Sequence, residues 1–428
     1  MNTVAEHPHV IRKAISDTPA ARCRFCQTVL QHTFVDLGTS PLCQRHIEPA
    51  DFNKAEAIYP LHAYVCDACF LVQLQDFVAA DEIFASDYAY FSSYSDSWLA
   101  HAARYVADIS ERLGLNANNF VVELASNDGY LLKNFVARGI PCLGIEPATN
   151  CATAARAVGV PTLCRFFGTH TAREVAESHG CADLIVGNNV LAHVPDLNDF
   201  VAGMKLLLGQ SGTITMEFPH LLALMAENQF DTIYHEHFSY FSFTTVRRIF
   251  AHHGLTIFDV EELPTHGGSI RIYAQHATKG DTLTPRATAL LSREAGAGIE
   301  SLDAYHGFGE RVRETKRRLL TFLIDARRRG KRVAAYGAPG KGNTLLNYCG
   351  IRTDFVDYTV DRSPHKQGRF LPGSRIPILH PDYITTTQPD YLLILPWNLR
   401  EEIMQQQAHI RTWGGKFVTP IPDVKVWD

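Results

Sequence analysis

Apolar runs separated by short polar turns recur along most of this chain, and their spacing predicts an α/β protein. Between about Ser97 and Leu113 the apolar residues recur every three or four positions, which predicts an amphipathic helix. The buried stripe of that helix would consist of Leu99, Ala103, Val106, Ile109 and Leu113. A continuous apolar run follows at residues 120–124 and predicts a buried parallel strand.

A nucleotide-binding unit is predicted around that strand. Small residues form a tight loop at 125–129, a helix starts at Tyr130, and a second strand at 142–145 ends in Glu146. In Rossmann-like folds such a loop brings the backbone close to the ligand, and the acid binds two ribose hydroxyl groups. The loop lacks the GxGxxG pattern that cradles a pyrophosphate. Because S-adenosylmethionine has no pyrophosphate, the single Gly129 favours S-adenosylmethionine over NAD.

Polar residues follow another predicted strand at 183–187. Asn188, Asn189 and His193 come at or just after its carboxyl end, where ligands bind in open α/β sheets. We therefore expect these side chains to face the cofactor site, although a structural role for His193 is the alternative. Residues 212–219 predict the next strand of the sheet.

The C-terminal part repeats the α/β pattern. A long helix is predicted at 299–329, and strands are predicted at 332–336, 357–361 and 390–398. The Gly-rich segment 337–344 lacks the spacing of a Walker A loop, but its amides and Lys341 are suited to bind an anion or to line a substrate pocket. Whether this second Rossmann-like sheet binds its own nucleotide or only walls the active site stays open.

Two CxxC pairs, Cys23/Cys26 and Cys66/Cys69, lie within the first seventy residues. Four thiolates in two such turns form a tetrahedral zinc site, and no open coordination position is indicated, so a structural zinc is predicted. A redox role is the alternative. The other six cysteines are single, as expected for reduced thiols in a cytoplasmic protein.

Four groups that can donate or accept a proton lie side by side at Tyr234, His235, Glu236 and His237. General acid–base chemistry needs such groups in apolar surroundings, which flank this segment on both sides. In a strand, His235 and His237 would share one face, but a loop would relax that rule. Polar residues on a surface turn are the alternative.

Residues 87–95 combine aromatic rings and hydroxyl groups at high density. Rings stack on bases and hydroxyls bind phosphate, so this segment is a candidate nucleotide contact. Packing at a domain junction is the alternative.

The composition is that of a globular protein. The 428 residues exceed one typical core, so two or three domains are expected. A net charge of −5 argues against a nucleic-acid partner, and no apolar run is long enough to span a membrane. Residues 1–20 lack the apolar segment of a secretory signal.

Taken in order, the paired CxxC, ELASNDG, GNNVLAHV, IYHEHFSYFS, THGGSIRIYA and AYGAPGKGNTLLNYCGI segments resemble the S-adenosylmethionine-dependent C-methyltransferases of nucleotide-linked deoxysugars. The resemblance spans roughly residues 23–397. It implies a small zinc-binding domain, a central Rossmann-like methyltransferase domain and a C-terminal Rossmann-like domain, with boundaries that we place at 20–82, 83–282 and 283–428. Many members have glycine where Ala125 stands.

The resemblance also implies roles. His237 would be the general base that forms an enolate beside the ketone of a dTDP-4-keto-deoxysugar, methylated at C-3 or in some members at C-5. Tyr234, Glu236 and His193 would surround the sugar. The predicted cofactor contacts are Glu123, Ala125, Ser126, Asn127, Asp128, Gly129, Glu146, Asn188 and Asn189. The predicted substrate contacts are Tyr88, Tyr90, Phe91, Ser92, Ser93, Lys341 and Asn343.

We expect a cytoplasmic monomer with no nucleic-acid or membrane partner. Two other classes remain at this stage. A nicotinamide-dependent sugar-nucleotide oxidoreductase would share both α/β sheets but would carry GxGxxG after the first strand. A zinc-scaffolded sugar-nucleotide-binding protein without catalysis would not need the proton-transfer groups at 234–237.

Overall fold

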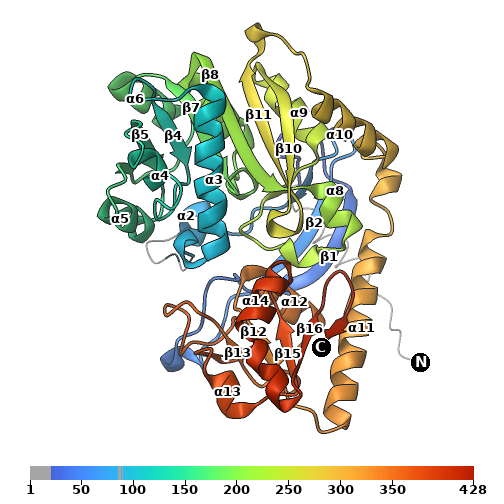
Figure 1. The fold of residues 1–428 in the computed structure, drawn as a ribbon. Helices are drawn as coiled ribbons and strands as arrows, with labels where there is room; N and C mark the ends of the chain where they lie inside the picture. Colours follow the sequence, from blue (N-terminus) through green and yellow to red (C-terminus); the bar gives the residue numbers. More distant parts are fainter. Residues whose placement is uncertain (1–20, 85–87, 89) are drawn as a thin grey trace, which may run out of the picture.

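The computed structural model describes residues 21–84, 88 and 90–428, and Figure 1 traces its three sheets. The polar N-terminal segment, Asp87 and Ala89 of the aromatic stretch therefore lie outside the described residues. Among the helices of the described part, none is both long and apolar enough to cross a bilayer.

The central sheet has seven strands in the order β10-β11-β8-β7-β4-β5-β6. The strands β8, β7, β4, β5 and β6 are parallel to one another. Strand β11 pairs antiparallel with β8, and the edge strand β10 pairs antiparallel with β11. In chain order the strands are β4 (Val121–Leu124), β5 (Cys142–Ile145), β6 (Thr162–Leu163), β7 (Ala182–Asn188), β8 (Leu208–Pro219), β10 (Leu255–Leu263) and β11 (Ser269–His276). All four residues of β4 and of β5 are buried, as their continuous apolar pattern predicts.

The helices of the central part are α3 (Asp96–Leu113), α4 (Lys133–Val136), α5 (Thr149–Ala157), α6 (Thr169–His179), α7 (Leu197–Leu207), α8 (Leu221–Ala226), α9 (Phe243–His252) and α10 (Pro285–Gly296). Among them, α8 packs into the core shared by the small sheet and the C-terminal part. The predicted helix at 97–113 is confirmed, but Ala103 is exposed and the buried stripe is shifted to Trp98, Ala102 and Tyr105 together with Val106 and Ile109. The helix predicted from Tyr130 begins only at Lys133, because residues 130–132 form turns.

A small four-stranded sheet lies between the two larger bodies (Figure 1). Its order is β1-β2-β3-β9 and all of its pairings are antiparallel. The strands are β1 (His32–Ser40), β2 (Tyr59–Val65), β3 (Val72–Leu74) and β9 (Ser239–Tyr240), and the short helix α2 (Ala80–Ile83) follows β3. The last strand, β9, comes from the central part of the sequence, so the zinc-binding region is joined to the segment that follows residues 234–237.

The C-terminal sheet has six strands in the order β14-β13-β12-β15-β16-β17. All pairings are parallel except that of the edge strand β17. The strands are β12 (Val333–Tyr336), β13 (Thr359–Val360), β14 (Ile378–Leu379), β15 (Tyr391–Ile394), β16 (Lys416–Thr419) and β17 (Lys425–Trp427). The helices are α11 (Phe308–Arg328), α12 (Gly340–Cys349), α13 (Tyr383–Thr387) and α14 (Arg400–Gln406).

The predicted α/β fold with three parts is confirmed, but the element boundaries in the C-terminal part differ from the prediction. The long helix starts at Phe308 rather than at 299, because Gly307 has a φ of 81° and cannot continue a right-handed helix. The preceding α10 was not predicted, and it packs on α9 and β10 of the central body. Only the first residues of the Gly-rich segment 337–344 form a loop, because α12 begins at Gly340.

One apolar core joins the central sheet to the zinc-binding cysteines, and a second joins β1 and β2 to α11 and the C-terminal sheet. The small sheet is therefore packed against both larger bodies. This arrangement holds the segments between the sheets in fixed positions.

Candidate active site

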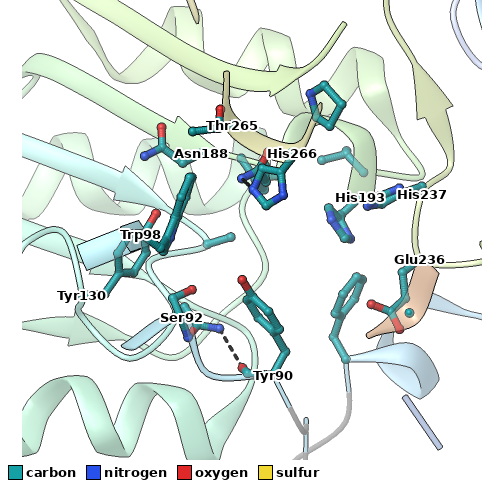
Figure 2. Close-up of a pocket in the computed structure, with 18 of the residues that line it drawn as sticks. Tyr90, Ser92, Trp98, Tyr130, Asn188, His193, Glu236, His237, Thr265 and His266 are labelled. Atoms are coloured by element: carbon teal, nitrogen blue, oxygen red, sulfur yellow. Dashed lines mark hydrogen bonds between the residues drawn. The ribbon is translucent and has the colours of Figure 1, made fainter. Parts of the chain in front are cut away.

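A cavity of about 1100 Å³ opens at the carboxyl ends of β4, β5 and β7. Its walls come from all three parts of the chain, and Figure 2 shows the labelled side chains gathered around it. Among the predicted site residues, those that line it are Tyr88, Tyr90, Ser92, Ala125, Asn127, Glu146, Asn188, Asn189, His193, Tyr234, Glu236, His237 and Lys341.

The loop after β4 is shaped by three residues with left-handed backbones. The φ angles are 55° at Ala125, 50° at Asn127 and 78° at Gly129. A Cβ atom at Gly129 would lie 3.0 Å from Val160 Cγ2, so glycine is required by space as well as by conformation. Alanine is strained in this conformation, so Ala125, which stands where many family members have glycine, carries a backbone cost.

Glu146 closes the loop from the end of β5. Its Oε2 accepts a hydrogen bond from the Asn127 amide at 2.9 Å, and its Oε1 accepts one from the Ala148 amide at 2.8 Å. Burial raises the pKa of this carboxyl to about 7, although the two amides oppose the rise. Each oxygen keeps a lone pair for a further donor, so the residue is suited to accept ribose hydroxyl groups from the cavity.

Asn127 also fixes the aromatic segment over the loop. Its Oδ1 accepts from the Ser92 amide at 2.9 Å, and its Nδ2 donates to the Tyr90 carbonyl at 3.1 Å. Ser93 donates its amide to Asp128 Oδ2 at 3.1 Å. The predicted substrate segment and the predicted cofactor loop therefore form one wall.

Asn188 at the end of β7 and the residues just after it line the cavity and carry unpaired polar atoms. Asn188 Nδ2, Asn189 Oδ1 and His193 Nδ1 are buried and have no hydrogen-bond partner among the described residues. Buried polar groups in folded proteins are normally paired. Their pairing with a bound ligand would remove this cost, and together with Glu146 and the open loop they fit an adenosyl cofactor.

Residues 234–237 form a turn, not a strand, and the side chains therefore do not alternate. His237 Nδ1 lies 2.8 Å from the Thr232 carbonyl, whereas His235 Nε2 lies 3.0 Å from the Pro60 carbonyl, away from the cavity. The ring of His237 lies 4.0 Å from that of Tyr234 and 4.6 Å from that of His193, measured between centroids. His235 and His237 therefore do not share one face, as they would in a strand.

Both ends of the turn are anchored to other parts of the molecule. Thr344 of α12 donates to the Ile233 carbonyl at 3.0 Å. On the other side, the Phe238 amide donates to the Ala192 carbonyl at 2.7 Å, and its carbonyl accepts from the Leu74 amide at 3.0 Å.

Glu236 is buried against the small sheet. Its Oε1 accepts from the Cys43 thiol at 3.2 Å and its Oε2 from the Tyr88 hydroxyl at 3.1 Å. Burial raises the pKa of this carboxyl to about 7, against the effect of the two donors and of Lys366. The carboxyl group can therefore exist in both protonation states near neutral pH.

Several predicted site residues lie behind the cavity wall instead of on it. Glu123 is buried, its carboxylate oxygens have no hydrogen-bond partner in the described part of the chain, and burial raises its pKa well above the usual range. Phe91 stacks on His365 at 5.3 Å, and Asn343 accepts a hydrogen bond from Asn347 within α12. The remaining members of this group are Ser93, Ser126, Asp128 and Gly129. Their predicted roles are not tested by this placement.

The cavity also contains residues that the sequence prediction did not include. Trp98 stacks over Tyr130 at 5.9 Å and meets His266 edge-on at 5.2 Å. Behind them, Glu217 binds His101 at 2.9 Å and also pairs with Arg271. The segment THGGSIRIYA contains His266 and Arg271, so the motif carried a signal for them.

The four paired cysteines form a compact cluster. All four sulfur atoms lie within 4.8 Å of one another, with 3.5 Å between Cys23 and Cys69 and between Cys26 and Cys66. Zinc–thiolate bonds of about 2.3 Å require sulfur atoms roughly 3.8 Å apart in a tetrahedron, so the cluster fits Zn²⁺. Gln73 Nε2 donates to the Cys23 sulfur at 3.2 Å and orients it.

Three family models match the chain in sequence order. The "Putative zinc binding domain" matches residues 23–84, the "Methyltransferase domain" 98–260, and the "C-methyltransferase C-terminal domain" 264–422. The curated relative C-methyltransferase NovU of Streptomyces niveus is 36% identical over 411 residues, which cover 95% of this chain and 97% of the relative. The chain belongs to the S-adenosylmethionine-dependent C-methyltransferases. Its cofactors are accordingly S-adenosylmethionine and zinc, and the oxidoreductase and the non-catalytic binding protein are excluded.

Solved structures resemble only part of this methyltransferase. The PH0226 protein of Pyrococcus horikoshii matches 44% of the chain and 95% of its own length, at 14% identity and a TM-score of 0.36. Magnesium protoporphyrin IX methyltransferase of Synechocystis matches 45% of the chain and 88% of its own, at 13% identity and a TM-score of 0.32.

Proposed function

We propose that this enzyme methylates C-3, next to the C-4 ketone of a dTDP-linked 4-keto-deoxysugar, and that His237 is the general base. The observation that carries the proposal is the hydrogen bond from His237 to the Thr232 carbonyl. A carbonyl oxygen only accepts, so Nδ1 carries the proton and the neutral ring keeps a free lone pair on Nε2.

The state of the ring suits a base. Burial and the neighbouring His193 lower the pKa of His237 well below its usual range, so the imidazole is neutral at pH 7. A neutral imidazole removes a proton from carbon only where donors stabilise the developing enolate oxygen. Tyr234 and His193 lie beside the ring and can act as such donors.

The cavity is large enough for a cofactor and a second ligand, since single-ligand sites commonly have about 300–1000 Å³. Bound S-adenosylmethionine supplies an activated methyl group to a carbon nucleophile. On the protein side, Glu146 and Asn127 hold the cofactor end of the cavity, and Glu236 accepts a sugar hydroxyl or amine. Tyr88, Tyr90 and Ser92 contact the nucleotide.

The curated relative is a C-methyltransferase by name, which supports the transfer to carbon. The sugar, the C-3 position and the base are our proposal. We also propose a cytoplasmic location, since none of the ten cysteines forms a disulfide. We further propose that the protein is a monomer.

The test is exchange of the ketosugar α-proton with heavy water, measured by NMR on dTDP-4-keto-6-deoxyglucose with S-adenosylhomocysteine present. His237→Asn keeps a side-chain amide for the Thr232 carbonyl but removes the base. We expect at least a 100-fold loss of exchange at C-3, with unchanged affinity for S-adenosylhomocysteine.

His235→Gln is the matched control, because its amide can replace the bond from Nε2 to the Pro60 carbonyl. It should keep exchange near the wild-type rate. Equal exchange in His237→Asn and wild type would refute the base, and exchange at C-5 alone would refute the position.

A further inference from the structure

Lys341 is held in place at the start of α12, in the wall of the active-site cavity. Its Nζ donates to Asn398 Oδ1 at 2.9 Å and lies 4.7 Å from the centroid of the Trp397 ring. Trp397 is itself fixed, since its Nε1 donates to Asp231 Oδ2 at 2.7 Å. A side chain that is usually flexible therefore has a defined ammonium position.

This ammonium group has no counter-ion at ion-pair distance within the described part of the chain. Burial lowers the pKa of Lys341, and Asp231 opposes this only from a greater distance. Lys366 lines the same cavity but differs, because its Nζ lies 3.8 Å from Asp361 and donates to the Ala338 carbonyl at 2.9 Å. Lys341 is only partly buried, but a charge held in a cavity wall without a counter-ion is still unfavourable, and a negative charge on a ligand would relieve it.

The charge of Lys341 acts on the part of the cavity that holds the imidazoles. Burial and then Lys341 lower the pKa of His266 to about 4, and Lys341 also contributes to the lowered pKa of His237. The ammonium group therefore lies close enough to these neutral rings to act on them. A negative charge that develops beside the rings would be stabilised by Lys341.

We propose that Lys341 is a catalytic residue whose ammonium group contacts the ketone oxygen of the bound substrate. The inference rests on the proposed function. When the α C–H bond breaks, the proton goes to Nε2 of His237 and the electron pair forms the carbon–carbon double bond. The carbonyl becomes an enolate oxygen, which Lys341 stabilises as an intact ammonium without transferring its own proton.

The experiment replaces Lys341 by methionine, which has a similar length and no charge. Exchange of the C-3 proton of dTDP-4-keto-6-deoxyglucose is measured at saturating substrate, with S-adenosylhomocysteine present. We expect a rate at least 100-fold below wild type, with a substrate affinity within about threefold of wild type. Because a partly buried charge without a counter-ion is removed, the melting temperature of the variant should be equal to or above that of wild type.

Lys341→Arg retains a cation and should keep a larger share of the rate than Lys341→Met. Lys331→Met is the control, because Lys331 pairs with Asp390 on the surface. Unchanged exchange at saturation would overturn the proposal, and so would an effect confined to substrate affinity, which would assign Lys341 to phosphate binding. A failure of the base proposal is distinguishable, since it would appear as normal exchange in His237→Asn.

Discussion

In the central sheet, β4 is followed by Ala125 with a φ of 55°, and the next strand, β5, is followed by Glu146. In the C-terminal sheet, β12 is followed by Gly337 with a φ of 89°, and its neighbour β13 is followed by Asp361. Both acids accept amide hydrogen bonds from the loop after the first strand: Glu146 from Asn127, and Asp361 from Ala338 at 2.8 Å. Strand, left-handed turn, helix and acid thus occur twice in one chain.

The two acids differ in the groups that surround their carboxylates. Glu146 accepts only backbone amides and faces the cavity, with a pKa raised by burial. Asp361 faces the ammonium group of Lys366, which also binds the Ala338 carbonyl. The protein's own lysine therefore occupies the place beside the acid in the second sheet. The strand–loop–helix–acid pattern alone does not distinguish a nucleotide site from a wall.

Removal of zinc should have the largest effect on the protein. The turn at 234–237 lies between the two larger sheets and continues into β9 of the zinc-binding sheet. Structural zinc contributes on the order of 10 kcal/mol in small domains. Chelation or Cys66→Ser should abolish α-proton exchange and lower the melting temperature by many degrees. A chelated protein with normal exchange would show that the small sheet is stable without metal.

Asp361→Ala should destabilise the fold by about 3–5 kcal/mol in urea unfolding, because it leaves Lys366 buried without its partner. The affinity for S-adenosylhomocysteine should not change. The double variant Asp361→Leu/Lys366→Met is the control and should recover most of the stability, since an apolar pair replaces the ion pair. A loss of cofactor affinity in Asp361→Ala would contradict the assignment of this sheet as a wall.

The raised pKa of Glu146 gives a pH dependence of stability. The carboxyl binds its proton more tightly in the folded chain, at a pKa of about 7 against 4.5 when unfolded. Its contribution to stability is therefore present below pH 4.5 and is lost as the pH rises through 7, by about 3 kcal/mol in the cofactor-free protein. Urea unfolding of wild type and Glu146→Gln from pH 4.5 to 7.5 measures this difference, which a flat profile would contradict.

Glu146→Ala should weaken S-adenosylhomocysteine about 100-fold in calorimetry, because hydrogen bonds to a charged acceptor contribute roughly 1.5–3 kcal/mol each. The alanine variant at Asp361 serves as its matched control. Equal affinities of both variants for S-adenosylhomocysteine would show that the two acids do not differ in cofactor binding.

The smallest effect is expected from Ala125→Gly, which makes the first loop like the second. An alanine at φ 55° is strained by about 1–2 kcal/mol, while glycine costs roughly 0.5–1 kcal/mol in unfolded-chain entropy. We expect a net gain in stability of at most about 1.5 kcal/mol, seen as a small rise in melting temperature. The reverse change, Gly337→Ala, should be destabilising, because its Cβ would lie 2.6 Å from Pro396. A loss of stability in Ala125→Gly would mean that the strain is absent.

The sequence predicted those features that depend on neighbours along the chain. The central strands, the zinc ligands and the acid after β5 each follow from a local pattern, and the structure and the family comparison confirm the fold and the zinc site. The turn at 234–237 could be located but not oriented, since the opposite directions of His235 and His237 depend on Pro60 and Thr232. The pairing of Lys366 with Asp361 could not be predicted either, because no periodic sequence pattern indicates that these two side chains meet.

The anchors of the turn have a consequence for when chemistry can begin. Ile233 is tied to α12, whereas Phe238 is tied to η3 (Leu191–His193) and to the residue that ends β3. The orientation of the His237 imidazole therefore depends on contacts of this turn with all three parts of the chain. If His237 is the base, as we propose, a chain in which only the central sheet had folded would bind the methyl donor without a positioned base, and the reaction would require the complete fold.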